Sequence, residues 1–575
     1  MTLWRNRELR QHIRVIDGSV APSIVLTNTT YLNVYTNQWV EANIWIYEDR
    51  IIYVGEKLPE ETTETEYYDC RGKFVVPGYI EPHSHPFQAA NPEVTAMYAA
   101  KTGTTTLVND NLTWYLLLNK KKTFSMINAF SNLPVSMFWW NRFDGQTTLK
   151  DKHIFNTKDV LDWAENPLVI QGGELTDWPS LLTGGDRLLY WIQEMKKLGK
   201  PIEGHLPGAS SRTLTKMKLL GITSDHESMT AEDVLKRLEL GYRVSLRYSP
   251  IRPDLPDIIE GLLEKGLTQF DNISFTMDGP TPAFMKDGMI NVCIEKAIEK
   301  GLPAETAYRM ASYHPARHFN MEEEFGSIAP GRVAHLNILM DKQNPHPESV
   351  IGKGKWIKKN GKDISFPSVI DWEKYDITPL ELDWELTEED LQFSSPIGMD
   401  MVNDVIIKPY SIVSDVSAEE ISSEKQEQFI TLIDKKGEWR VNTIIRGFAP
   451  KLGALASSYS ATGDIILIGN SKKDIAKATQ RMKALGGGIV LADQGEILAE
   501  MPLPLGGVMP DNKMEELIEM NEKIKKVLTE YGYAYQDPIY SLLFLSAFHL
   551  PFFRITQQGL LDVKMREIVI PATMR

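Results

Sequence analysis

The sequence predicts an α/β protein whose centre is a (β/α)8 barrel, joined to a small β-rich domain and an additional C-terminal α+β domain. Three observations lead to this expectation. Between residues 75 and 325, short apolar runs alternate with helix-like stretches, which is typical of repeated βα units in a parallel barrel. Residues 23–56 contain short alternating strands separated by polar turns. A chain of 575 residues is also too long for one hydrophobic core.

The domain boundaries are placed where the pattern changes. The small β-rich domain combines residues 1–74 with 326–365, because GSIAPGRVAHLNIL returns to strand character and can rejoin the first strands. The catalytic barrel covers 75–325. Residues 366–428 are rich in Glu, Asp, Ser and Pro and lack periodicity, so we expect a connecting region there. Residues 429–575 form the C-terminal domain, with a helix, a hairpin and a second helix.

Composition excludes several classes of protein. The formal net charge is −15, which argues against a nucleic-acid partner or an anionic membrane surface, since both need a basic face. Cys70 and Cys293 are the only cysteines, so neither a disulfide framework nor a thiolate metal site is expected. The start of the chain is polar and charged, unlike a secretory signal, and the apolar stretch 541–553 is too short to span a bilayer. We therefore expect a cytoplasmic location.

Two histidines follow an apolar run that ends in a Pro-Gly turn, in FVVPGYIEPHSHPF. On a strand, residues i and i+2 point to the same face, so His83 and His85 project together. A strand end in a barrel directs them to the mouth, where two imidazoles can hold one metal ion. The alternative is a pair of surface or turn histidines.

Four later apolar runs also end in a residue that can bind a metal, namely Glu174, His205, His226 and Asp278. Each carboxylate alone could instead be a helix cap. Together with the two histidines they form a set of nitrogen and oxygen ligands, which suits Zn, Mn or Fe(II). Six ligands exceed what one ion needs when a water position stays open, and Glu174 could bridge two ions. The sequence therefore predicts a binuclear divalent metal site.

Hydrolysis at such a site needs a nucleophile and a proton shuttle. Two metals bridged by hydroxide supply the nucleophile at neutral pH. Asp278 is a candidate to bind one ion and accept the hydroxide's proton. Glu227 directly follows His226 and could flank the site, although it could also be the acidic start of the next helix.

Several stretches resemble the adenine deaminase family of the amidohydrolase superfamily. They are KPIEGHLPGASSRTLTKMKLLGITSDHESMTAEDVLKRLELG, GSIAPGR, HPAR, LGALASS, GGGIVLADQGEILAEMPLPLGGVM and DPIYSLLFLSAFHLPFFRIT, which together extend over almost the whole chain. The resemblance implies a deaminase that converts adenine and water to hypoxanthine and ammonia in purine salvage or catabolism. It implies that Glu227 is a catalytic acid/base and that the ions are Mn(II) or Fe(II), with Zn also compatible. It further implies that the metal ligands are His83, His85, Glu174, His205, His226 and Asp278.

The chain departs from the family pattern close to these ligands. The family's Ile-Glu-Ser-Ser after HxH is replaced by residues 86–89, Pro-Phe-Gln-Ala, and its Asp-Pro-His-Glu by residues 110–113, Asp-Asn-Leu-Thr. Gly279 stands where a second Asp usually follows, and Met289 stands for the His of a Gly-His pair. Ser460 to Gly463 replace the His-Asp-Ser-His of the C-terminal domain. The inferred ligands survive, whereas polar residues around them become apolar or small.

These departures leave the substrate open. A site that has lost matched hydrogen-bonding groups can discriminate strongly against its former substrate. The alternatives to adenine are a different purine, more apolar or modified, and a cyclic amide or amidine. Phe87 could stack on a planar ring or pack in the core.

A non-catalytic binding relative is the alternative from another class, and the retained Asp278 and Glu227 argue against it. The expected partner is a small molecule, and the C-terminal domain could also serve a homo-oligomer. We expect Trp139 and Trp140 to form barrel wall or to take part in a substrate pocket. We see no ligand-like context for five other histidines, His153, His318, His335, His346 and His549.

Overall fold

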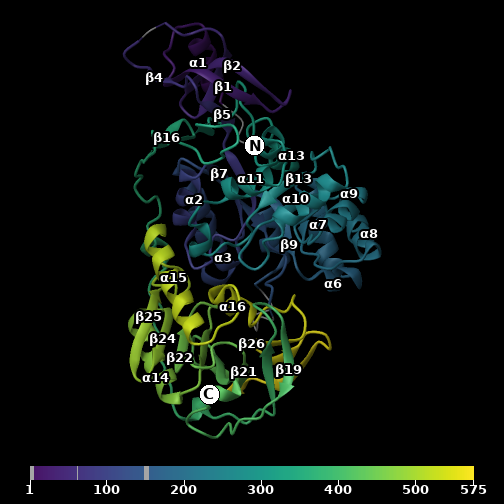
Figure 1. Cartoon of the computed structure of the whole chain (residues 1–575), viewed down its shortest axis with the longest axis vertical. Helices are drawn as coiled ribbons and strands as arrows, with labels where there is room; N and C mark the ends of the chain where they lie inside the picture. Colours follow the sequence, from purple (N-terminus) through teal and green to yellow (C-terminus); the bar gives the residue numbers. More distant parts are fainter. Residues whose placement is uncertain (1–4, 61, 148–153) are drawn as a thin grey trace.

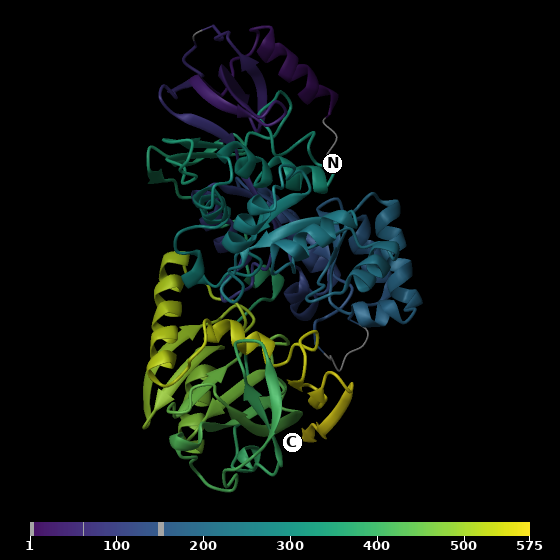
Figure 2. The same cartoon turned by 45° about the vertical axis from the view of Figure 1, so that its right-hand side comes forward.

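A computed structural model of the chain describes residues 5–60, 62–147 and 154–575. Three regions follow one another along the long axis: a β-rich region, a barrel in the middle, and a C-terminal region that contains the chain's last residue (Figure 1). The turned view in Figure 2 shows the same order, with the C-terminal region against one end of the barrel. Within the described part of the chain, no helix has the length and apolar character needed to cross a membrane.

The barrel is an eight-stranded parallel sheet whose strands are neighbours in chain order, from β6 to β13, within the described residues. The sheet nearly closes at the predicted site, where the backbone N–H of His85 donates to the carbonyl oxygen of Asp278 at 3.0 Å. The strands are β6 (Tyr79–Ser84), β7 (Thr104–Asn109), β8 (Ser136–Asn141), β9 (Val169–Leu175), β10 (Ile202–Gly204), β11 (Ser224–Asp225), β12 (Arg243–Arg247) and β13 (Ile273–Thr276).

The barrel strands form because their residues are buried on both faces, as in β6, β7 and β9, where every residue is buried. Helices cover the outside, and local capping starts several of them. Asn91 accepts a hydrogen bond from the Val94 N–H at the start of α2, and Thr230 accepts one from the Asp233 N–H at the start of α9. The helices are α2 (Pro92–Lys101), α3 (Leu112–Leu117), α4 (Lys120–Ala129), α5 (Thr157–Glu165), α6 (Trp178–Leu182), α7 (Asp186–Lys197), α8 (Ser211–Leu219), α9 (Ala231–Glu239), α10 (Leu255–Glu264), α11 (Ile290–Glu299), α12 (Ala304–Met310) and α13 (Tyr313–His318).

The β-rich region joins strands from both sides of the barrel in one sheet. Strand β14 pairs antiparallel with β5, and β5 pairs in parallel with β1, so the chain returns after the barrel to the sheet it left. Helix α1 (Asn6–Ile16) lies beside it. The strands are β1 (Ile24–Asn33), β2 (Gln38–Tyr47), β3 (Arg50–Gly55), β4 (Glu66–Asp69), β5 (Phe74–Pro77), β14 (Leu336–Leu339), β15 (Ser349–Gly352), β16 (Lys355–Lys359) and β17 (Lys362–Asp363).

The C-terminal region is a mixed sheet with two long helices and a three-stranded hairpin sheet, β26-β27-β28. Strands β18 and β19 lie within residues 366–428, where we expected only a connection, and β18 pairs with β21 of this sheet. The elements are β18 (Ile397–Met401), β19 (Ile407–Ser411), β20 (Glu427–Ile433), β21 (Trp439–Arg446), β22 (Ala454–Ser457), β23 (Ile465–Gly469), α14 (Lys472–Ala484), β24 (Gly488–Asp493), β25 (Glu496–Pro502), α15 (Met514–Glu530), α16 (Pro538–Phe544), β26 (Phe553–Thr556), β27 (Gly559–Asp562), β28 (Glu567–Pro571) and β29 (Thr573–Met574).

Buried hydrogen bonds fix the C-terminal region over the mouth of the barrel. The Asn91 side-chain amide donates to the Pro510 carbonyl at 2.9 Å, and the Thr281 hydroxyl donates to Asp537 at 2.7 Å. Because buried polar groups are costly to leave unpaired, these bonds set one orientation of the two regions. The barrel mouth therefore faces the C-terminal region.

Candidate metal centre and active site

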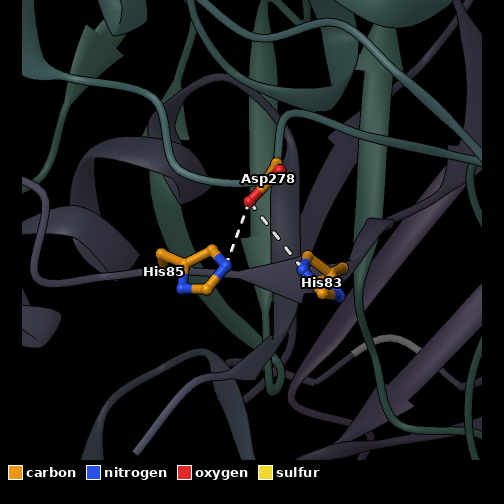
Figure 3. Close-up of side chains that lie close together, drawn as sticks. All are labelled: His83, His85 and Asp278. Carbon is orange, nitrogen blue, oxygen red and sulfur yellow. Dashed lines mark ion pairs between the residues drawn. The ribbon is translucent and has the colours of Figure 1, made fainter. Parts of the chain in front are cut away.

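All six predicted ligands meet at the mouth of the barrel, where its strands end. The Nε2 atom of His85 lies 3.0 Å from Asp278 Oδ1, and the Nε2 atom of His83 lies 3.8 Å from the same oxygen (Figure 3). His83 is in β6, His85 directly follows it, and Asp278 follows β13, which is the neighbour of β6 across the barrel closure. The two-residue spacing of the histidines thus brings both rings to one carboxylate.

Glu174 joins the other two histidines to this group. Its Oε1 atom lies 2.6 Å from His205 Nδ1 and 3.4 Å from His226 Nε2. Its Oε2 atom lies 3.9 Å from His85 Nε2, so the carboxylate reaches both halves of the site. Three sets have their ligand atoms within 4.8 Å of one another and could each hold a metal ion: His83, His85 and Asp278; His83, Glu174 and His226; and His205, His226 and Glu227.

His83 lies at the centre of the group with both ring nitrogens buried and, among the described residues, without a hydrogen-bond partner. Burial lowers the pKa of His83 well below its ordinary value, so the ring is neutral and keeps an unused lone pair. Its ring packs at a tilt of 41° against Trp140, with 4.4 Å between ring centroids. A buried polar atom without a partner is uncommon and calls for a ligand or a water. The donor set therefore fits a divalent metal ion.

Carboxylates behind the ligands orient two of the histidine rings. Glu203 Oε1 lies 3.1 Å from His226 Nδ1, and Asp110 Oδ2 lies 3.0 Å from His85 Nδ1, which leaves both Nε2 atoms facing the centre. Burial alone would lower the pKa of His85, but hydrogen bonds to Asp110 and Asp278 raise it to about 9. Both rings are therefore paired with the acidic groups around them.

Arg247 connects the two predicted catalytic carboxylates. Its Nη1 atom donates to Glu227 Oε1 at 2.6 Å and lies 2.8 Å from Asp278 Oδ2, while Arg252 donates to Glu227 Oε2 at 2.9 Å. Burial raises the pKa of both carboxyl groups, but the nearby cations outweigh it, so both pKa values lie below the ordinary range. Glu227 and Asp278 are therefore anions held in place.

Arg142 forms a second ionic support on the opposite side. Its Nε and Nη2 atoms each donate to a carboxylate oxygen of Asp110 at 2.8 Å, and Nη2 also reaches Glu174 at 3.3 Å. Gln146 donates to Glu174 at 2.7 Å. A bidentate arginine–carboxylate pair fixes geometry as well as charge. The Arg142–Asp110 pair therefore supports both halves of the site, because Arg142 contacts Glu174 and Asp110 contacts His85.

Sequence reasoning missed Arg142, Glu203 and Arg247. The position at a strand end, which indicated the candidate ligands, could also have indicated the two arginines, because Arg247 ends β12 and Arg142 directly follows β8. Glu203 is in β10, two residues before His205, and only the spacing of two residues along a strand could have indicated its place.

A cavity of about 1180 Å³ lies between the barrel mouth and the C-terminal region. Its barrel side includes His85, Glu174 and Asp278. Its other side includes residues 459–463 and 547–551, which we call the roof. Leu112, Thr113 and Ser460 to Gly463, which depart from the family pattern, all line the cavity, whereas Met289 is fully buried at the start of α11.

Aromatic side chains divide between core and cavity. Phe87 packs edge-on against Trp114, with 4.8 Å between ring centroids, and also lines the cavity, so packing and a contact with substrate are compatible. Trp139 and Trp140 are fully buried. His549, for which the sequence showed no ligand-like context, lies edge-on to His205 at 4.9 Å and its Nδ1 atom has no partner among the described residues. His153 lies outside the described residues.

Comparison with known proteins agrees with this geometry. Residues 74–357 match the amidohydrolase family, and residues 405–567 match the adenine deaminase C-terminal domain. A protein of Oceanobacillus iheyensis named "Putative adenine deaminase" is 70% identical, covering 100% of this chain and 99% of its own length. One of Bacillus cereus with the same name is 51% identical, covering 99% of this chain and 97% of its own. Oceanobacillus iheyensis also has an "Adenine deaminase" that is 27% identical, covering 97% of both chains.

The barrel and its site define an amidohydrolase, an enzyme that hydrolyses carbon–nitrogen bonds. Within that class the chain belongs to the adenine deaminase family, over its whole length.

Proposed function

We propose that the protein hydrolyses adenine to hypoxanthine and ammonia. One observation carries the proposal: four histidines and two carboxylates meet at the barrel mouth, beside a cavity that opens between the barrel and the roof. The close relatives, named for adenine deamination, support the same reaction. In this reaction a bond forms between the water oxygen and purine C6, and the bond from C6 to the amino nitrogen breaks.

The metal ligands in this proposal are His83, His85, Glu174, His205, His226 and Asp278, and the ions are two Mn(II) or Fe(II), with Zn(II) also compatible with these donors. When bound, such ions lower the pKa of water and supply a nucleophile at neutral pH. The unpartnered nitrogens of His83 and the ring orientation set by Glu203 support this assignment.

Asp278 and Glu227 handle the protons. Asp278 is an anion at the centre and accepts a proton from the attacking water. Glu227 lies 3.5 Å from His205 and 3.4 Å from His226, and it passes a proton between the reacting centre and the substrate. Ammonia leaves only when the amino nitrogen has been protonated, so both carboxylates must exchange protons during the reaction. Arg247 keeps each in the charged form between turnovers.

A second candidate, a modified or more apolar purine, is favoured by the cavity. Its volume exceeds the usual range of about 300–1000 Å³ for small-molecule sites. Apolar side chains such as Leu116, Leu117 and Val508 line it beside the polar ones. The presence in Oceanobacillus iheyensis of both a 70% identical and a 27% identical relative also favours separate substrates for the two.

The test is ammonia release from adenine by the purified protein loaded with Mn(II), with Asp278→Asn as the control. Turnover that is lost in the variant supports adenine deamination. No turnover with about two metal ions bound per chain would contradict adenine as the substrate and keep the second candidate, for which substituted purines and cyclic amides would be screened. No metal and no turnover would contradict both.

The proposal also includes a cytoplasmic location and a purine base as the ligand. The names of the relatives support the purine base, and Cys70 and Cys293, which are buried and unpaired as in a reducing compartment, support the location. A homo-oligomer formed through the C-terminal region is compatible with this reading.

A further inference from the structure

A side-chain amide lies beside the candidate metal centre and is held by the roof. Gln88 follows His85 by three residues, in the loop between β6 and α2, and its side chain is half-buried. The Tyr459 hydroxyl donates to Gln88 Oε1 at 2.6 Å, across the boundary between the barrel and the C-terminal region. Both residues line the cavity, together with His85 and Asp278.

Gly279, next to Asp278, makes room for this amide. A Cβ atom at position 279 would lie 3.0 Å from both Cγ and Nε2 of Gln88, and 3.2 Å from the Cβ atom of His85. These distances are shorter than ordinary van der Waals contact, so a larger residue at 279 would displace the amide. The two departures from the family pattern at positions 88 and 279 therefore depend on each other, because the Gln88 side chain occupies the space that Gly279 leaves.

The hydrogen bond to Tyr459 determines which end of the amide is free. Burial raises the pKa of Tyr459 well above its ordinary value, so the phenol keeps its proton and acts as a donor. Gln88 Oε1 is thereby occupied, and the two N–H groups of Nε2 have no acceptor among the described residues. The amide consequently offers two N–H donors next to the metal ligands, while its oxygen already accepts from Tyr459.

We propose that Gln88 is a specificity-determining residue that donates from Nε2 to a ring nitrogen of the purine, and that Tyr459 and Gly279 are positioning residues for it. The inference rests on the proposed function, because it takes the ligand to be a purine base. Ring nitrogens are acceptors, and a site that is built to hydrogen-bond one of them discriminates against an analogue in which carbon replaces it.

The direct experiment measures the binding of adenine and of 1-, 3- and 7-deazaadenine to the Mn(II)-loaded protein. The wild type should bind one deaza analogue about 10- to 100-fold more weakly than adenine, because a donor is left unpaired. In Gln88→Leu that difference should disappear for this analogue alone. Gln558→Leu, another glutamine that lines the cavity, is the matched control and should keep it.

Tyr459→Phe, which removes a single oxygen atom, should reduce the difference in affinity between adenine and that analogue. Gly279→Ala alone should also reduce it, but adding Gly279→Ala to Gln88→Leu should have no further effect on it. Equal affinity of the wild type for all four ligands, or a preference that survives Gln88→Leu, would overturn the inference. Adenine that binds without releasing ammonia would contradict the proposed reaction while the binding comparison still tests Gln88.

Discussion

The two sides of the cavity differ in their chemistry. The barrel side holds the predicted ligands and Glu227, here called the rim, and ion pairs with Arg142 and Arg247 fix its three carboxylates. On the other side, the roof segments read YSATG and AFHLP and contain no Asp, Glu, Lys or Arg. The roof segments therefore offer shape and hydrogen bonds, while the charged residues of the C-terminal region that line the cavity, such as Asp404 and Lys564, lie outside them. We infer that the rim determines the reaction and the roof and its contacts determine the substrate.

The largest effect should follow from replacing His83, the predicted ligand whose ring nitrogens have no hydrogen-bond partner among the described residues. His83→Gln should lose metal and lower kcat by more than about 100-fold, since even residues behind ligands are worth 10- to 100-fold. Metal content and kcat of the purified variant are the measurements. His346→Gln, at a half-exposed histidine paired with Glu295, is the control and should behave as the wild type. A His83 variant with full metal content would place the metal elsewhere.

Arg247→Gln should change the pH dependence of the reaction. Because Arg247 lowers the pKa of Glu227 and Asp278, its removal lets both pKa values rise, and the carboxylates are then protonated at a higher pH. The acidic limb of the kcat/KM profile should therefore move to higher pH, with activity lost as pH falls. Arg243→Gln, at the other end of β12, is the matched control. An unchanged acidic limb would show that Arg247 does not control the pKa values on which activity depends.

Glu203→Gln should weaken metal binding by about 10- to 100-fold, because Glu203 orients His226 through its Nδ1 atom. Titration of the metal-free protein with Mn(II) measures this change. Glu264→Gln, at an exposed residue of α10, controls for the loss of one negative charge. Unchanged affinity would show that the ring of His226 needs no support from this carboxylate.

The smallest effect is expected in the roof. His549→Phe keeps a ring against His205 and removes a nitrogen without a partner, so kcat/KM should change by less than about tenfold and the metal content should not change. A loss of metal in this variant would show that a roof residue also takes part in metal binding, which contradicts the separate roles of rim and roof.

The sequence was sufficient to predict the barrel and the convergence of the six candidate ligands at its mouth, because both follow from local rules. Buried strands alternate with helices, and each ligand stands at or just after a strand end. Other features depend on partners distant in the chain. Asp110 and Arg142 are 32 residues apart, and Gln88 and Tyr459 are 371 apart. Strands β18 and β19 are short and carry no clear alternation, so their pairing with the C-terminal sheet left no pattern to read.

The most direct test of the central claim is anomalous X-ray diffraction from crystals of the protein grown with Mn(II). We expect anomalous density at two positions among the six predicted ligands, His83, His85, Glu174, His205, His226 and Asp278. Density that is absent from this group, or that lies at other residues, would contradict the assignment of the rim as the metal centre.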